Sequence, residues 1–282
     1  MSPRATVWRC GRFELSLGRP LVMGILNVTP DSFSDGGDHE DPAAAVAWGE
    51  RLVSQGADVL DIGGESTRPG SELVFPAEEL SRVRPVVMRM AHADLPISID
   101  TRHADVARGC IEVGASIVND VSGFLDPEMV GLVAHSDVGV VVMHMLGEPR
   151  TMQAKPRYDD VAAEVGGFLL AQAALLEASG VERERIAIDP GIGFGKTLEH
   201  NLALLRSLPE LSGHGYPVLV GVSRKRFIGE LSGEEEPKLR LGGSIAAAIE
   251  ATRLGANIVR VHDVLETVQA MNVANAIRRD ND

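Results

Sequence analysis

Three adjacent cations directly follow an apolar run in the last quarter of the chain. The run at 218–222 leads into Ser223, Arg224, Lys225 and Arg226. Adjacent positive charges repel one another unless they are solvated or neutralised, and the chain carries a formal net charge of -13. A solvated basic turn would explain the cluster without any function. A pocket for an anionic or electron-rich ligand would also explain it, and the rest of the sequence favours the pocket.

Polar residues of varied chemistry also end the other apolar runs of the chain. One aspartate in such a place is often only a helix cap, and one histidine is more often a satisfied core residue than a ligand. Capping alone does not account for a polar residue at nearly every run end. These residues are Asn27, Asp61, Asp100, Asn119, Asp120, His144, Asp189, Ser223, Lys225, Arg260 and His262.

The runs themselves have the length of β-strands and alternate with helix-like stretches. They lie at 21–28, 58–63, 96–100, 117–120, 139–144, 186–189, 218–222 and 258–262. Nearly continuous apolar runs are typical of parallel strands buried on both faces. Eight strand-then-helix units predict an α/β fold of the TIM (β/α)8 barrel type, with an open doubly wound sheet as the alternative. In a barrel the active site lies at the carboxyl ends of the strands, where these polar residues would gather.

Local signals place the remaining elements. An alternating segment at 6–17 predicts a short N-terminal hairpin ahead of the barrel. An aspartate followed by proline opens two expected helices, at 41–42 and at 126–127. Within 76–92 the expectation is different, because Pro85 should kink or break any helix there.

Composition narrows the class of protein. At 282 residues an α/β barrel commonly forms one domain, so we expect a single domain over 1–282. We find no segment that approaches the apolar length of a bilayer span and no secretory signal, so we expect a soluble protein without a membrane partner. Cys10 and Cys110 lack metal-ligand spacing, which fits a reduced cytoplasm. The acidic balance argues against a nucleic-acid partner.

Three glycine-rich segments follow predicted strands. The segment 189–197 (DPGIGFGKT) is not a phosphate-binding P-loop, because Pro190 stands where the first glycine is required. Its glycines instead favour a backbone that passes close to a flat ligand, with Asp189 and Phe194 facing it. The segments 29–37 (TPDSFSDGG) and 63–70 (GGESTRPG) carry hydroxyl groups that could close over a substrate.

Seven ordered motifs together resemble the dihydropteroate synthases. The resemblance covers almost the whole chain and differs mainly in the N-terminal piece and around 146–158. The motifs lie at 24–37, 61–70, 98–101, 119–123 (NDVSG), 189–197, 223–229 (SRKRFIG) and 260–264 (RVHDV).

The resemblance implies a TIM-barrel transferase of folate synthesis and a target of sulfonamides. The enzyme would join 4-aminobenzoate to 6-hydroxymethyl-7,8-dihydropterin diphosphate and release pyrophosphate, with Mg²⁺ as cofactor and a homodimer as the assembly. Both substrates are small molecules, and the work is mainly positioning and stabilisation of the leaving group.

The resemblance also implies roles for individual residues. The catalytic set would be Lys225, Asp35, Arg68 and Asp100. The pterin would contact Asp100, Asn119, Asp189, Lys225, Phe194 and Met143, with Lys225 paired to Asp189. The diphosphate would contact Asn27, Thr67, Arg68, Arg260 and His262, and Asn27 would hold the Mg²⁺. The 4-aminobenzoate would contact Phe33, Pro69, Ser223 and Phe194. We further expect Asp35 to pair with Arg68 once the diphosphate is bound, which would complete the aminobenzoate pocket.

Three other functions remain alternatives. A methyltransferase of the same fold that uses a methylated folate would need the same pterin edge but no diphosphate site. A class I aldolase would use Lys225 as a Schiff-base nucleophile. A non-catalytic pterin-binding barrel would keep the pocket without turnover.

Overall fold

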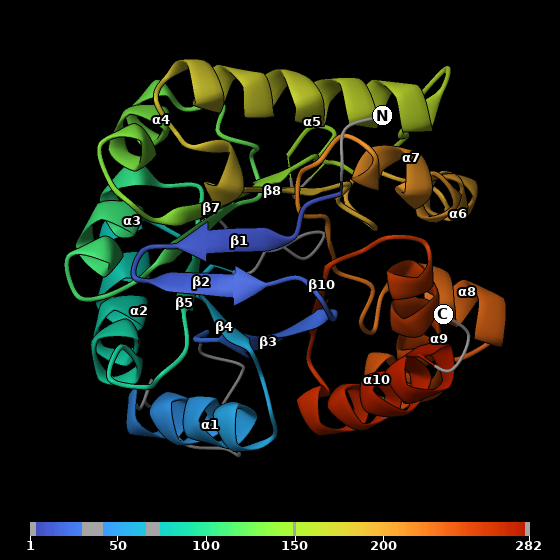
Figure 1. The fold of residues 1–282 in the computed structure, drawn as a ribbon, viewed down its shortest axis with the longest axis horizontal. Helices are drawn as coiled ribbons and strands as arrows, with labels where there is room; N and C mark the ends of the chain where they lie inside the picture. The colour runs from blue at the N-terminus through green and yellow to red at the C-terminus, as the bar shows by residue number, and fades with distance from the viewer. Residues whose placement is uncertain (1–3, 30–41, 66–73, 149–150, 280–282) are drawn as a thin grey trace.

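Eight parallel strands form a barrel with helices around it (Figure 1). The computed structural model describes residues 4–29, 42–65, 74–148 and 151–279. The strands neighbour one another in the order β8-β7-β6-β5-β4-β3-β10-β9. A parallel bridge between Ile188 of β8 and Val218, the residue before β9, joins the two ends of this sheet. The prediction of a TIM barrel is therefore confirmed, and the open sheet is excluded.

Each predicted apolar run contains one barrel strand. Because the register pairs these strands in parallel throughout, their carboxyl ends meet at one end of the barrel. The strands are β3 (Leu21–Asn27), β4 (Val59–Gly63), β5 (Ile97–Asp100), β6 (Ile117–Asp120), β7 (Gly139–Met143), β8 (Ile186–Asp189), β9 (Leu219–Val220) and β10 (Ile258–Val261).

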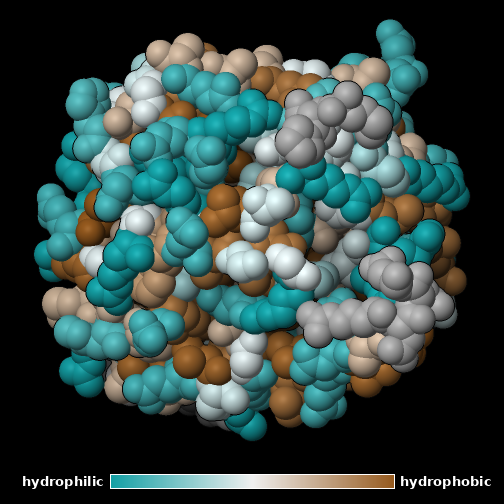
Figure 2. All heavy atoms as spheres, in the orientation of Figure 1, coloured by the Kyte–Doolittle hydropathy of each residue, from teal (hydrophilic) through white to brown (hydrophobic). Residues whose placement is uncertain are grey.

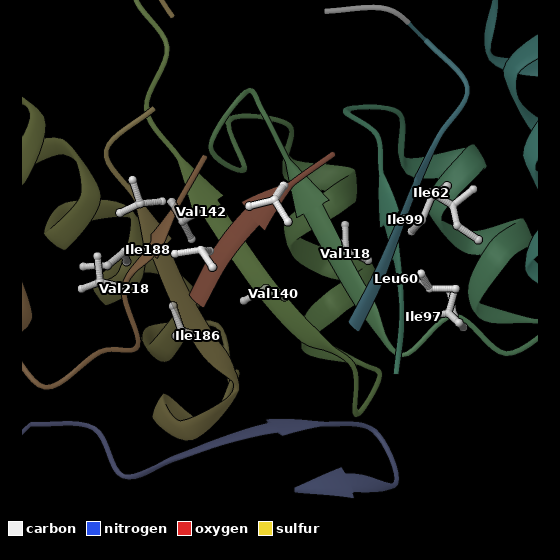
Figure 3. Packing of buried hydrophobic residues seen from close by; sticks show 14 of the residues in the cluster. Leu60, Ile62, Ile97, Ile99, Val118, Val140, Val142, Ile186, Ile188 and Val218 are labelled. Carbon is white, nitrogen blue, oxygen red and sulfur yellow. The ribbon is translucent and has the colours of Figure 1, made fainter. Parts of the chain in front are cut away.

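Successive strand residues serve two separate apolar cores. One set packs between the strands and the helices, and Figure 3 labels several of its members, among them Leu60, Ile99 and Val142. The alternate residues form a second cluster inside the barrel, for example Val59 and Val141. Successive side chains of a strand point to opposite faces. The parity of a residue, meaning its odd or even place along the strand, therefore also decides whether a polar side chain points into the barrel.

The predicted N-terminal hairpin covers the amino ends of the strands. Its strands β1 (Val7–Cys10) and β2 (Phe13–Ser16) pair antiparallel. Trp8 is fully buried in the cluster inside the barrel, and its Nε1 donates to the carbonyl of Arg185 at 3.1 Å. On the face that carries the hairpin, polar side chains are dispersed among apolar ones (Figure 2). Because the hairpin closes this end of the barrel, the opposite end remains for a site.

The helices follow the strands in the expected order. Asp126 caps α4 by accepting from the Glu128 N–H at 2.9 Å, as its sequence predicts. The helices are α1 (Pro42–Ser54), α2 (Pro76–Met90), α3 (Ala104–Ile111), α4 (Pro127–Ala134), α5 (Val161–Ala178), α6 (Leu198–Arg206), α7 (Leu208–Ser212), α8 (Arg226–Ser232), α9 (Leu241–Arg253) and α10 (Val264–Arg279), with short 3-10 turns at Arg183–Arg185 and Pro237–Leu239.

Of the two outcomes expected at Pro85, a kink or a break of the helix, the break does not occur. α2 runs through this proline from Pro76 to Met90. A proline inside a helix removes one backbone hydrogen bond and costs about 3 kcal/mol. The side chains of Val83, Val86 and Val87 are fully buried on the same helix, and burying three valines contributes more, at about 1.5 to 3 kcal/mol each.

We expected no segment long and apolar enough to span a membrane, and helix α5 departs from this expectation. By length and composition α5 could cross a membrane, with a mean hydropathy of 1.4 over 18 residues. Core helices of soluble proteins pass the same test. In this structure α5 contacts β7 and β8, and Val165, Leu169, Ala173 and Leu176 are buried against the barrel wall. Its apolar character therefore serves the core around the barrel.

Candidate functional site

A small cavity opens at the carboxyl ends of the strands. It is formed by polar strand ends on one side and by the segment after β8 on the other. Its lining consists of Asp100, Asn119, Val121, Met143, Asp189, Gly191, Ile192, Phe194, Gly221, Lys225 and Arg260. The six residues that we expected around the pterin therefore lie together, and Arg260 lies with them. A wider groove between α3 and α4 lies on the outer helix layer, away from these strand ends.

Arg260 links two carboxylates beneath the cavity. Its Nε donates to Asp61 at 2.5 Å, and its Nη2 donates to Asp100 at 2.6 Å. Asp61 is fully buried and also accepts from the Asn119 amide at 3.3 Å. Although burial acts to lower it, the pKa of Arg260 is raised because both carboxylates favour the cation. The network holds four side chains from four strands in one arrangement.

Asp61 belongs to this network, although the family resemblance assigned it no role. It ends an apolar run like the others, and it faces the barrel interior with Asp100 and Asn119 because of the strand parity. Asp120 also ended a run but has the opposite parity. Its carboxylate accepts from the N–H groups of Ser122 and Phe124, so Asp120 stabilises a turn outside the cavity.

One buried acceptor atom in the cavity lacks a donor within the described part of the chain. Asp100 Oδ1 is buried and has no hydrogen-bond partner. Burial raises the pKa of Asp100, and the Arg260 cation opposes that rise. Burial also raises the pKa of Asp189 to about 6, while a bond from the Gly191 N–H at 2.7 Å opposes the rise. A buried acceptor without a donor costs about 1 to 3 kcal/mol, so a ligand with N–H groups suits this place.

Lys225 faces the cavity above an aromatic ring. Its Nζ lies 4.0 Å from the centroid of the Phe194 ring. Burial, and then the nearby Arg260 cation, lower the pKa of Lys225 to about 8, while Asp189 and Asp100 act in the opposite direction. Among the described residues, the Lys225 Nζ does not lie within 4.0 Å of an Asp189 carboxylate oxygen, so the expected ion pair is not formed. Lys225 lies over the Phe194 ring instead, and it interacts with the Asp189 charge at longer range.

The three adjacent cations of the sequence point in different directions. Arg224 has a φ of 59° and donates to Asp263 at 3.0 and 2.5 Å. Arg226 lies at the surface, with its side chain 81% exposed, and pairs with Glu230 at 2.7 Å. Only Lys225 of the three lines the cavity. The reading of the whole cluster as a solvated turn therefore holds for Arg226 alone.

Ser223 and His262 meet at the ends of β9 and β10. The Ser223 hydroxyl lies 3.1 Å from His262 Nδ1, and the His262 N–H donates to the same oxygen at 3.3 Å. Asn27 ends β3 at the same end of the barrel and is partly exposed. Its side-chain amide makes no hydrogen bond to other described residues, so its oxygen is available to a ligand.

Five expected site residues lie outside the described residues. They are Phe33, Asp35, Thr67, Arg68 and Pro69, which belong to the two glycine-rich segments after β3 and β4. Their roles, and the pairing of Asp35 with Arg68, stay predictions.

An acidic cluster lies at the start of the second of these segments. The donor atoms of Glu65, Glu79 and His103 lie within 4.8 Å of one another. Arg102 donates to both oxygens of Glu65 at 3.1 and 3.0 Å, which neutralises that carboxylate. Glu79 is fully buried, and neither of its oxygens has a hydrogen-bond partner within 3.5 Å among the described residues. Burial raises the pKa of Glu79 to about 7, and the Thr101 hydroxyl, which lies near the carboxylate, only partly offsets the rise.

Comparisons with known proteins show to which family the chain belongs. The model of the family described as "Pterin binding enzyme" matches residues 23–262. A dihydropteroate synthase of Neisseria meningitidis serogroup C is 50% identical over 275 residues, which is 96% of this chain and 97% of that protein. The Xanthomonas albilineans dihydropteroate synthase, solved with 4-aminobenzoic acid, is 49% identical with a TM-score of 0.92, over 97% of this chain and 98% of that one.

A second similar structure was solved with a different ligand. The Burkholderia cenocepacia dihydropteroate synthase, complexed with 7,8-dihydropteroate, is 45% identical with a TM-score of 0.90, and the match covers 99% of both chains. These matches extend over the barrel strands and over the segments that build the cavity. The chain therefore belongs to the pterin-binding enzymes and, among them, to the dihydropteroate synthases.

Proposed function

We propose that the protein condenses 6-hydroxymethyl-7,8-dihydropterin diphosphate with 4-aminobenzoate to give 7,8-dihydropteroate and pyrophosphate. The observation that carries the proposal is the cavity in which buried carboxylates, an amide and a lysine face one space. Related enzymes solved with 4-aminobenzoate or with 7,8-dihydropteroate support the same substrates.

The cavity suits the polar edge of a pterin. That edge carries N–H donors beside ring acceptors. Asp100 Oδ1 and the Asp189 carboxylate supply acceptors, and Asn119 supplies an amide whose nitrogen is already bonded to Asp61. Lys225 supplies a donor from the opposite side. A site built of such groups rejects flat ligands that lack them, because its own polar atoms would then stay unpaired.

The reaction needs a good leaving group more than a strong base. The bond between the pterin methylene carbon and the diphosphate oxygen breaks, and its electron pair leaves with pyrophosphate. The aminobenzoate nitrogen then forms a bond to that carbon and gives up one proton. The cation of Lys225 and the stacked ring of Phe194 hold the ring system in place, so that positioning supplies much of the rate.

The diphosphate would lie toward Asn27, Arg260 and His262. Two nitrogens of Arg260 are already occupied by Asp61 and Asp100, and its Nη1, which has no hydrogen-bond partner among the described residues, remains for an anion. The unpaired amide of Asn27 fits Mg²⁺, because this ion takes oxygen ligands and keeps several waters and phosphate oxygens around it. When bound, Mg²⁺ would neutralise the charge of the leaving pyrophosphate. Thr67 and Arg68 belong to the same proposal through the family resemblance.

The aminobenzoate would lie between Phe194 and Ser223, with Phe33 and Pro69 contributed by the family resemblance. Ser223 is buried beside His262, and its hydroxyl is oriented by two contacts to that histidine. The catalytic roles of Asp35 and Arg68 rest on the resemblance as well.

The cellular location and the oligomeric state of the enzyme are also part of the proposal. Free, buried thiols at Cys10 and Cys110 support a reducing cytoplasm. Family membership supports a homodimer, which light scattering would report as twice the chain mass of 30.1 kDa.

Product analysis tests the proposed function. The purified protein is incubated with the pterin diphosphate, 4-aminobenzoate and Mg²⁺, and both products are measured. The proposal expects 7,8-dihydropteroate and pyrophosphate in equal amounts, and neither product when one substrate is omitted. Pyrophosphate without dihydropteroate, or tight pterin binding without turnover, would contradict it.

A further inference from the structure

The lysine of the DPGIGFGKT segment is buried although it serves no P-loop. Lys196 is 3% exposed. Its Nζ donates to the carbonyl of Phe194 at 2.9 Å and to the carbonyl of His144 at 3.2 Å, and it lies 3.1 Å from His144 Nδ1. An ammonium group has three donors, so these contacts satisfy all of them. The lysine thereby joins the segment after β8 to the end of β7.

The two joined segments touch through their backbones. Gly191 has a φ of 65°, and a Cβ there would lie only 1.9 Å from the His144 carbonyl oxygen. A Cβ on Gly195, with a φ of 63°, would lie 2.8 Å from the Leu146 backbone. No side chain fits between the segments at these points. Polar contacts help to set their relative position, among them the bond from the His144 N–H to the Asp189 carbonyl at 3.1 Å and the contacts of the buried Lys196.

The electrostatics match these contacts. Burial, and then the Lys196 charge, lower the pKa of His144 to about 4, which keeps the imidazole neutral and leaves Nδ1 able to accept. Burial lowers the pKa of Lys196 to about 7, while Asp189 favours its charged form and Lys225 opposes it. Within the described residues no carboxylate lies within ion-pair distance of Lys196. Burying an amine costs free energy unless it is hydrogen-bonded, and the contacts of Lys196 to two carbonyls and one imidazole offset that cost.

One of the two carbonyls belongs to the residue whose ring faces the cavity. Phe194 lines the cavity, and its ring lies under Lys225 Nζ at 4.0 Å. The same segment is held elsewhere by Gln153, which donates to the Gly193 carbonyl at 2.6 Å, and by Tyr158, which donates to the Gly195 carbonyl at 3.0 Å. Lys196 donates to the Phe194 carbonyl itself, and the Phe194 N–H donates to the Gly191 carbonyl at 3.1 Å within the same segment.

We propose that Lys196 is a positioning residue for the proposed reaction: by holding the Phe194 carbonyl against the end of β7, it sets the Phe194 ring beneath Lys225. It touches neither substrate and acts through Phe194. The expected loss of activity rests on the proposed function. The expected displacement of the Phe194 ring can be tested without measuring activity.

A double-mutant cycle tests the kinetic consequence. Lys196→Met and Phe194→Leu should each lower kcat/KM for 4-aminobenzoate roughly tenfold to a hundredfold, the range expected when a reacting group is misplaced by about 1 Å. The kcat/KM of the double variant should be no more than about threefold below that of the less active single variant, because both changes disturb one interaction. Lys196→Arg, which keeps the donors, should recover part of the loss. Lys238→Met, at an exposed position, serves as the matched control and should match the wild type.

Independent losses that multiply in the double variant would overturn the proposal. A crystal structure of Lys196→Met provides the second measurement, and it does not depend on activity. The proposal expects the Phe194 ring to leave its place beneath Lys225, and an unmoved ring would overturn the proposal even if turnover were low. A wild-type protein without dihydropteroate synthesis would overturn the proposed function instead, and the crystal structure would still decide the role of Lys196.

Discussion

Arg260 Nε donates to Asp61 Oδ2 at 2.5 Å, although 199 residues separate the two along the chain. The pair joins β10 to β4 inside the barrel, and Asp100 on β5 completes it. Breaking a buried pair by removing one partner is costly, since the other charge stays buried without compensation. The floor of the cavity therefore depends on Asp61 as much as on the residues that line the cavity.

Asp61→Asn should destabilise the fold and weaken pterin binding. We expect the free energy of unfolding to fall by about 3 kcal/mol, because Arg260 loses one of its two buried carboxylates. Chemical denaturation at neutral pH measures the change.

Glu250→Gln is the matched control for that variant. Glu250 pairs with Arg253, and the two side chains are 54% and 60% exposed. An exposed pair contributes little to stability. Equal losses in the two variants would show that the buried network has no special importance.

Glu79→Gln should change how stability depends on pH. The folded protein raises the pKa of Glu79 from its usual 4.5 to about 7, so the folded state binds a proton that the unfolded state has released between these pH values. Wild-type stability therefore falls as pH rises through this window. Relative to wild type, the variant should gain about 3 kcal/mol between pH 4.5 and pH 7.5.

Denaturation at several pH values measures that difference. Glu65, Asp100, His103 and Arg102 surround Glu79 in both proteins, so their own titration largely cancels in the comparison. A stability difference that stays constant with pH would mean that Glu79 is ionised throughout.

Much of the barrel could be predicted from the sequence because its strands are buried on both faces. Such strands stand out as apolar runs, and their polar ends mark the carboxyl end of the barrel. The parity of a strand residue also follows from its position, which separates Asn119, inside the barrel, from Asp120, outside it. Those parts of the site depend on local pattern alone.

Other features depend on contacts that no local pattern encodes. The directions of Arg224, Lys225 and Arg226 follow from a left-handed backbone at Arg224 and from its pairing with Asp263. The continuous helix through Pro85 depends on how its buried face packs. Long-range partners of this kind appear only once the chain is folded.

Lys225→Ala should cost about 2 to 4 kcal/mol of transition-state stabilisation, which corresponds to a fall in kcat/KM of roughly 30-fold to 900-fold. The cation faces the cavity beside Asp189 and Asp100, and both favour its charged form. Steady-state kinetics with both substrates measure the loss. Arg226→Ala, next in sequence but exposed, should retain wild-type rates. Similar losses in both variants would assign the effect to net charge rather than to the site.

Removal of Mg²⁺ should depress turnover and leave the fold intact. If Asn27 holds the ion against the diphosphate, excess chelator lowers the rate, and added Mg²⁺ restores it. Asn27→Ala should raise the Mg²⁺ concentration needed for half-maximal rate. Circular dichroism with chelator checks that the secondary structure persists. Unchanged rates in excess chelator would remove the ion from the mechanism.

The most direct test of the site is a crystal structure of the protein with 7,8-dihydropteroate. The account predicts that the pterin ring lies in the cavity, that its polar edge bonds to Asp100, Asn119 and Asp189, and that Lys225 donates to it from the other side. A product bound elsewhere, or bound in the cavity without hydrogen bonds to these side chains, would contradict the account.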